Sequence, residues 1–322
     1  MKNNIIILAA GKGTRMKSSK LKVLHELAGT PIIQYVINAV NNNNNKLFVV
    51  VGHQSTEVEN TINNKDITFI EQKEQLGTGH AVQQVITELK TNVEGSTLIL
   101  TGDSPLIQKD TLDQLIATHN ESNASATVLT TMLENPHGYG RIIRGDMGTV
   151  LGIREQKDCS EEETKIKEIN SGVYIFKTNL LVDYIFNLST NNKQKEYYLT
   201  DIIEILKSEG HVVNSYCTEN NYEVLGINTR QDLSKANQIL FQLNNEKLMK
   251  NGVTILDPKS TFIDSTVQIG SDTIIEPFTI IKGKTEIGSN CHIGPFVEIN
   301  NVIVEKNTVI KKENIKELTK VN

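Results

Sequence analysis

Hydrophobic and polar positions in the first part of the chain follow two alternating patterns. Continuous apolar runs, typical of strands buried on both faces of a parallel sheet, occupy residues 4–10, 46–52, 67–72 and 96–103. Helical spacing of apolar residues follows or precedes them at residues 31–40, 78–90 and 109–120. The first of these helices opens on Pro31, and proline is common in the first turn of a helix. Strands and helices that alternate in this way predict a doubly wound, Rossmann-like α/β domain.

The pattern changes between Ser125 and Phe176. Short alternating stretches appear here, such as residues 125–133 and 171–177. We interpret this segment as an inserted, partly antiparallel region that covers the substrate. The asparagine run at 41–45 predicts a loop.

The last third of the chain begins with a helix and continues with a repeat of six residues. Residues 229–250 have apolar residues at helical spacing, which Asn251 and Gly252 end, so we expect a linker helix. Isoleucine then recurs at every sixth position, and compact residues recur four places after each, a pattern that predicts a hexapeptide β-helix. The isoleucines are Ile263, Ile269, Ile275, Ile281, Ile287, Ile293 and Ile299, and the compact residues are Val267, Thr273, Thr279, Thr285, Cys291 and Val297.

The six-residue step is interrupted near the carboxyl end. After Ile299 it shortens to Val304 and then resumes at Ile310, before a polar and charged tail. We therefore expect a brief solenoid, whose isoleucines point inward.

The composition of the chain argues against several classes of protein. The chain has 322 residues, 22% of them charged, and a net charge of only −5, so no basic excess predicts a nucleic-acid partner. Its three cysteines lie far apart and form no C-x-x-C pair, which excludes a zinc site of that type and disfavours disulfides. No segment approaches the roughly 20 apolar residues of a membrane span. We expect a cytoplasmic protein without membrane insertion.

The first apolar run ends in the glycine-rich turn "ILAAGKGTRM", residues 7–16. It is no dinucleotide fingerprint, because Met16 stands at the place of the third glycine, and no Gly-Lys-Ser/Thr follows as a P-loop requires. Gly11 and Gly13 let backbone N–H groups approach a phosphate, and Arg15 and Lys22 add positive charge. The turn therefore predicts an anion site; the alternative is a plain turn with solvated basic residues.

Two further segments suggest ligand contacts. In "LILTGDSPLI", Thr101, Gly102 and Asp103 end a buried strand, at the carboxyl edge where open α/β sheets bind ligands. A carboxylate beside phosphates suits Mg²⁺; the alternative is a cap on the next helix. In "EQKEQLGTGHA", Gly77 and Thr78 precede a helix and would allow the backbone to approach a flat base, although they could also be a simple helix cap. We expect no catalytic histidine.

Taken in order, "ILAAGKGTRM", "EQLGTGHA", "GYGRI", "EINSGVYIF" and "EYYLTDII" resemble the N-acetylglucosamine-1-phosphate uridylyltransferases. In that family this part is usually the amino-terminal half of a bifunctional enzyme. The resemblance runs from about Asn4 to Phe296. It implies a nucleotidyltransferase domain at residues 1–228, a linker helix at 229–250, and a short left-handed parallel β-helix with a tail at 251–322.

The resemblance also implies a reaction and the residues that perform it. The reaction is Mg²⁺-dependent uridylyl transfer from UTP to N-acetylglucosamine-1-phosphate, which releases pyrophosphate. Arg15 and Lys22 would hold the phosphates, while Asp103 and Asn228 would ligate Mg²⁺. The nucleotide would lie on Leu8, Ala9, Ala10 and Gly11, with the uracil at Gln72, Gly77 and Thr78. The amino sugar would bind at Gly140, Glu155 and Asn170.

The chain departs from the family pattern at three places. Leu21 replaces a proline before "KVLH", and Thr101 replaces a tyrosine that is frequent before Gly102 and Asp103. The β-helix is also short, so we expect no acetyl transfer to glucosamine-1-phosphate. The family further implies a homotrimer.

Two alternative functions stay open at this point. One is nucleotidyl transfer to another sugar phosphate. The other is a non-catalytic regulatory subunit with the same two-domain plan. Such subunits tend to lose the loop cations and the metal aspartate, and this chain keeps them.

Overall fold

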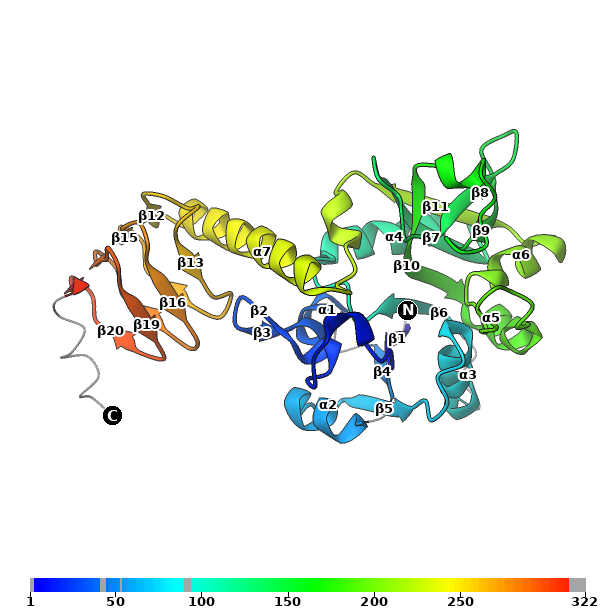
Figure 1. The fold of residues 1–322 in the computed structure, drawn as a ribbon, viewed down its shortest axis with the longest axis horizontal. Coiled ribbons are helices and arrows are strands. Elements are labelled where there is room, and N and C mark those ends of the chain that lie inside the picture. Colours follow the sequence, from blue (N-terminus) through cyan, green and yellow to red (C-terminus); the bar gives the residue numbers. More distant parts are fainter. Residues whose placement is uncertain (1–2, 41–44, 53, 90–93, 313–322) are drawn as a thin grey trace. The chain divides into compact units, whose positions relative to one another are not determined.

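The computed structural model describes residues 3–40, 45–52, 54–89 and 94–312 (Figure 1). They form two compact units. The first comprises Met1–Leu24 and Ile32–Asn228, and the second comprises His25–Pro31 and Thr229–Asn322. Most of the predicted loop at 41–45 (residues 41–44) lies outside the described residues, as does most of the charged tail.

The first unit is built on a sheet whose main path runs β11-β7-β10-β6-β1-β4-β5. Its parallel part matches the four apolar runs: β1 Asn4–Ala9, β4 Lys46–Val51, β5 Ile67–Glu71 and β6 Ser96–Thr101. β1 lies between β4 and β6 and is parallel to both. Ile5, Ile6 and Ile7 are all buried, because helices cover both faces of the sheet.

The helices of this unit divide between the two faces, as the doubly wound prediction requires. One apolar core contains residues of α3 (Thr78–Leu89), α5 (Thr178–Tyr184) and α6 (Asp201–Ser208). The other contains residues of α1 (Ile32–Val40), α2 (Ser55–Ile62) and α4 (Lys109–Glu121). The α/β fold class is confirmed, and Pro31 stands just before α1 rather than inside it. Short 3-10 turns complete the unit: η1 Thr14–Met16, η2 Lys22–Leu24, η3 Glu163–Lys165, η4 Ile185–Asn187 and η5 Asn221–Val224.

The segment from Ser125 to Phe176 is only partly the inserted cover that we predicted. β7 (Ala126–Met132) and β10 (Glu168–Lys177) belong to the central sheet, where β10 runs antiparallel to both β6 and β7. β11 (Val213–Thr218) extends the sheet as a parallel neighbour of β7. Only β8 (Arg141–Arg144) and β9 (Val150–Arg154) form a hairpin beside β10. Alternating hydrophobicity marks a strand with two unlike faces, and it does not reveal whether that strand joins the main sheet.

The second unit begins with a hairpin that the sequence did not predict. β2 (Glu26–Leu27) and β3 (Thr30–Pro31) pair antiparallel through Ala28 and Gly29. The backbone N–H of Ala28 donates to Asn237 Oδ1 at 2.9 Å, which joins the hairpin to α7 (Arg230–Lys250). α7 begins with a capping box between Thr229 and Asp232, so the helix predicted for 229–250 is present, and it groups with the second unit.

Residues 254–310 form a left-handed parallel β-helix of three sheets, with four, three and three strands. The strands are β12 Thr254–Ile255, β13 Phe262–Ile263, β14 Gln268–Ile269, β15 Ile274–Ile275, β16 Ile280–Lys282, β17 Glu286–Ile287, β18 His292–Ile293, β19 Glu298–Asn300, β20 Ile303–Val304 and β21 Val309–Ile310. The repeated isoleucines stack between coils, as in the pairing of Ile263 with Ile281 and then Ile299. They fill the interior together with the compact residues four places later, as predicted.

The shortened step after Ile299 does not end the β-helix. Val304 pairs with Ile287 seventeen positions earlier, and Ile310 then pairs with Ile293. Asn301, with a φ of 54°, lies in the turn where one residue is missing. A tight turn therefore absorbs the lost residue, and both Val304 and Ile310 stay buried.

Within the described part of the chain, the structure contains no helix that is both long and apolar enough to span a membrane.

Candidate active site

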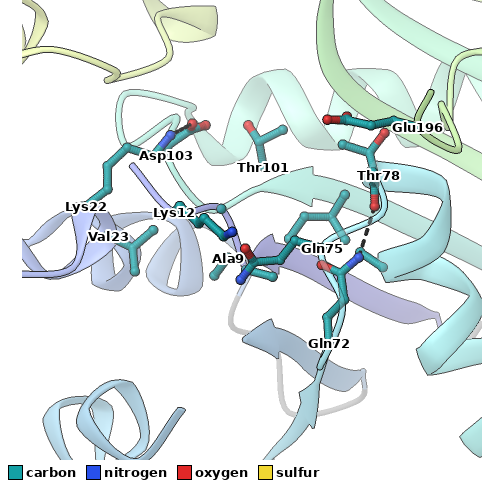
Figure 2. Close-up of a pocket in the computed structure, with 15 residues that line it drawn as sticks. Ala9, Lys12, Lys22, Val23, Gln72, Gln75, Thr78, Thr101, Asp103 and Glu196 are labelled. Carbon is teal, nitrogen blue, oxygen red and sulfur yellow. Dashed lines mark hydrogen bonds and ion pairs between the residues drawn. The ribbon is translucent and has the colours of Figure 1, made fainter. Parts of the chain in front are cut away.

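A cleft of about 440 Å³ lies in the first unit, at the carboxyl ends of the parallel strands β1 and β6. Figure 2 shows Lys22 and Asp103 together on one side, with Gln72, Thr78 and Glu196 on the other. The predicted residues that line this cleft are Leu8, Ala9, Ala10, Gly11, Lys22, Gln72, Gly77, Thr78, Thr101 and Asp103. Segments distant in sequence therefore meet where open α/β sheets place their ligands.

The glycine-rich turn keeps its backbone close to Lys22. Gly13 has a φ of 59°, and a Cβ added there would lie 2.7 Å from Cβ of Lys22. A Cβ added to Gly11 would meet nothing within 4 Å, so this part of the turn faces open space. A side chain at position 13 would therefore push Lys22 away from the turn, whereas glycine lets the two approach.

Lys22 and Asp103 line one end of the cleft, and there they meet Arg15 and Asn228, which are not among its lining residues. Lys22 Nζ forms an ion pair with Asp103 Oδ2, and the two side chains are 11% and 22% exposed. Asn228 Oδ1 accepts hydrogen bonds from Lys22 Nζ at 3.2 Å and from Arg15 NH2 at 2.9 Å. The backbone N–H of Ile227 donates to the Asp103 carbonyl at 2.9 Å, which carries Asn228 to this position. We call Arg15, Lys22, Asp103 and Asn228 the ion cluster.

The strand that carries Asp103 is fixed against its neighbours. The N–H of Gly102 donates to the Leu8 carbonyl at 2.8 Å, and a Cβ at position 102 would lie 3.1 Å from Ala9 Cβ. Thr101 Oγ1 and Ser104 Oγ are 2.9 Å apart. These contacts hold Thr101 and Gly102 at the junction of β1 and β6, where the side chain of Asp103 emerges.

The other end of the cleft is organised around Gln72. Its side chain is buried, and its Nε2 donates to the Gly77 carbonyl at 3.1 Å. Because a carbonyl can only accept, this bond fixes which way the amide points. Among the described residues Oε1 of Gln72 has no hydrogen-bond partner.

Gly77 and Thr78 are tied to the segment that carries Glu196. Gly77 has a φ of 113°, and a Cβ there would lie 2.6 Å from the Tyr197 carbonyl oxygen. The hydroxyl of Thr78 accepts from the backbone N–H of Leu199 at 3.1 Å. Position 77 thus requires glycine for both its backbone angle and the close approach.

The three residues assigned to the amino sugar lie near one another but do not line this cleft. The backbone N–H of Asn170 donates to the Gly140 carbonyl at 2.9 Å, and Asn170 Nδ2 donates to the Tyr174 hydroxyl at 2.6 Å. Glu155 Oε1 accepts from Thr200 at 3.3 Å. Burial raises the pKa of the Glu155 carboxyl, and burial and the Glu155 charge together raise the pKa of Tyr174.

Residues that the sequence did not single out as site residues also line the cleft. Lys12, Gln75 and Glu196 are the polar ones. All three stand in segments already noted for their motifs, yet a motif does not show which of its side chains faces a ligand. Val23 and Ala81 complete the wall.

Comparisons with known proteins agree with this architecture. The Nucleotidyl transferase family matches residues 4–240, and the bacterial transferase hexapeptide family, as six repeats, matches residues 266–301. The crystal structure of a UDP-glucose pyrophosphorylase complexed with UDP-glucose superimposes with a TM-score of 0.60 over 76% of this chain and all of that one. At 16% identity this likeness concerns the fold alone.

Curated relatives match nearly the whole chain. The bifunctional protein GlmU of Enterococcus faecalis is 47% identical over 313 residues, which are 97% of this chain and 68% of that protein. The proteins of the same name from Listeria monocytogenes and Levilactobacillus brevis are 43% and 44% identical, over 98% and 95% of this chain and 68% and 67% of theirs. The chain therefore belongs to the nucleotidyl transferase family, as a homologue of the GlmU proteins in which a sugar-1-phosphate nucleotidyltransferase domain is followed by hexapeptide repeats.

Proposed function

We propose that this chain transfers the uridylyl group of UTP to N-acetylglucosamine-1-phosphate and releases pyrophosphate, with Mg²⁺ as cofactor. The observation that carries the proposal is the ion cluster at one end of a nucleotide-sized cleft whose other end holds the buried amide of Gln72. A volume of about 440 Å³ lies within the usual range for small-ligand sites.

The orientation of Gln72 supports a uracil base. With Nε2 committed to Gly77, Oε1 is left to accept a hydrogen bond from a ligand. Uracil offers an N3–H donor, whereas cytosine has an acceptor at that position. Backbone atoms of Gly77 and Thr78 would lie against the base, and Leu8 to Gly11 would line the nucleotide.

The donor set of the ion cluster fits Mg²⁺. Asp103 Oδ2 and Asn228 Oδ1 both contact the ammonium of Lys22, so the two oxygens already converge on one positive charge. Mg²⁺ commonly takes one or two protein oxygens and completes its shell with water and phosphate. The described residues contain no group of three or more His, Cys, Asp or Glu side chains placed for a metal, and this ion does not require one.

The chemistry needs no general base from the protein. The phosphate of the sugar substrate is largely ionised at neutral pH, and one of its oxygens attacks the α-phosphorus of UTP while pyrophosphate leaves. Arg15 and Lys22 would hold and neutralise the phosphates, and Gly11 and Gly13 would let the backbone approach them. When bound by Asp103 and Asn228, Mg²⁺ would supply positive charge that stabilises the reacting phosphates. Gly140, Glu155 and Asn170 would orient the amino sugar.

A substrate panel tests this proposal. Purified chain with Mg²⁺ is supplied with each pair of UTP, dTTP, CTP or ATP and N-acetylglucosamine-1-phosphate or glucose-1-phosphate, and pyrophosphate release is measured. The proposal requires fastest release with UTP and N-acetylglucosamine-1-phosphate. Faster release with another pair would instead support the alternative transferase. The family membership already disfavours a non-catalytic subunit.

We further propose that the chain forms a homotrimer through its β-helix. Ile303 of β20 and Val309 of β21 are 72% and 52% exposed, so their apolar side chains are free to pack against a second copy of the β-helix. Light scattering at micromolar concentration should give three times the chain mass of 35.9 kDa. Ile303→Glu, at a position exposed in the single chain, should weaken the assembly without unfolding it. A monomeric mass for the unmodified chain contradicts this proposal.

Acetyl transfer is not expected from these 322 residues alone. His292, the single histidine after residue 211, has its Nε2 2.7 Å from Glu276 Oε1 on the preceding coil, so it is engaged within the β-helix. With acetyl-CoA and glucosamine-1-phosphate, we expect no thiol release above background. Steady release would overturn this expectation.

A location in the cytoplasm stays a prediction.

A further inference from the structure

The ion cluster has a feature that the proposed reaction does not require. Both oxygens that we assign to Mg²⁺ are engaged by side-chain cations: Asp103 Oδ2 by Lys22, and Asn228 Oδ1 by Lys22 and Arg15. Asn228 Nδ2 lies 3.4 Å from the Gly226 carbonyl, an arrangement that directs Oδ1 toward the cations. The position between the two oxygens therefore already holds a positive charge.

A metal ion and this ammonium exclude each other. Mg²⁺ binds oxygen at about 2.1 Å, whereas Lys22 Nζ already lies at hydrogen-bonding distance from both oxygens. Two cations at such spacing also repel strongly where solvent screening is weak, and the Lys22 side chain is only 11% exposed. The metal can enter only after the ammonium has moved.

Lys22 has somewhere to move. Its Cβ lies against Gly13, so the stem of the side chain starts beside the glycine-rich turn. Gly11 of this turn faces open space, and both Gly11 and Lys22 line the cleft. A triphosphate on the turn would offer the ammonium several anionic oxygens in exchange for Asp103.

We propose that Lys22 is the resident cation of this site and lowers its affinity for a divalent metal until an anionic ligand draws the ammonium away. This proposal rests on the proposed function. In the proposed reaction Lys22 favours binding of the phosphates, whereas here it opposes binding of the metal before the nucleotide is present. Without nucleotide, removing the ammonium should strengthen metal binding, because only the fraction of molecules with a free Asp103 can bind metal.

The test measures Mn²⁺ binding to the full chain without nucleotide, by the loss of the free Mn²⁺ signal in electron paramagnetic resonance. Lys22→Met keeps most of the side-chain length and removes the charge. We expect it to tighten Mn²⁺ binding about tenfold or more. Lys12→Met is the matched control, because Lys12 lines the same cleft and forms no ion pair within the described residues. It should change the affinity less than threefold.

A second pair of variants locates the effect. Lys22→Met combined with Asp103→Asn should lose the tightened binding, since the carboxylate that the metal gains is then absent. Lys22→Gln serves in place of Lys22→Met if the latter unfolds, which thermal unfolding would show. Unchanged or weaker Mn²⁺ binding by the Lys22 variant overturns the proposal. So does equal tightening by Lys12→Met, tightening that survives loss of Asp103, or the absence of binding by every variant.

This readout is independent of turnover. If the unmodified chain releases no pyrophosphate from any substrate pair, the proposed function fails, and the Mn²⁺ comparison still decides whether Lys22 competes with metal. If the chain is active and Lys22→Met does not tighten Mn²⁺ binding, only the inference about Lys22 fails.

Discussion

Asp103→Asn should abolish measurable nucleotidyl transfer at ordinary Mg²⁺ concentrations, a loss of roughly 10³-fold or more. The substitution keeps the size of the side chain and removes its charge. Asn228 would then be the one remaining protein ligand that we assign to the metal, and it is neutral. Lys22, only 11% exposed, would at the same time lose its ion-pair partner.

The measurement is pyrophosphate release as a function of Mg²⁺ concentration. Asp113→Asn provides the control, because it makes the same chemical change on α4, where Asp113 pairs with Lys109 at the exposed surface. The control should match the unmodified chain. Activity that persists in excess chelator would remove metal from the mechanism, and near-normal activity of Asp103→Asn would remove this residue from the metal site.

The fold could be predicted well where the spacing of hydrophobic residues is compatible with a single type of structure. Isoleucine at every sixth position has no place in a helix or an ordinary strand, so it identified the β-helix. Short or polar elements carry no such signal. α2 buries only Val58, and each strand of the hairpin at 26–31 has two residues. β7 and β10 were expected in an inserted region that covers the substrate, because alternation alone does not distinguish a covering strand from a strand of the central sheet.

The site was predictable to the extent that topology brings its parts together. The glycine-rich turn and Asp103 follow β1 and β6, and neighbouring parallel strands end at one edge of the sheet. Asn228 stands 125 positions after Asp103, and it arrives through a backbone hydrogen bond of Ile227 that no pattern reveals. Only the family resemblance pointed to it. Gln75 and Glu196 were missed because their contact with the cleft depends on the direction of their side chains, which the sequence does not show.

Arg15→Ala should lower turnover by roughly 10²- to 10⁴-fold, the range for losing a group that stabilises charge on transferring phosphates. Arg15 is exposed in η1, and NH2 donates to Asn228 Oδ1 at 2.9 Å. An exposed side chain with this contact adds little to folding stability. The variant should therefore unfold at nearly the same temperature as the unmodified chain, which separates a catalytic defect from a folding defect.

Arg15→Lys makes the test sharper, because it keeps the positive charge and loses the planar fork of donors. Arg15→Lys could turn over faster than Arg15→Ala and more slowly than the unmodified chain. That result would show that the charge of Arg15 supplies part of its contribution to turnover and that bidentate contact with phosphate supplies the rest. Since Arg15 and Lys22 share the oxygen of Asn228, their alanine variants should combine non-additively. Arg15→Ala with more than half of the normal activity would exclude Arg15 from the mechanism and leave Lys22 as the principal cation of the ion cluster.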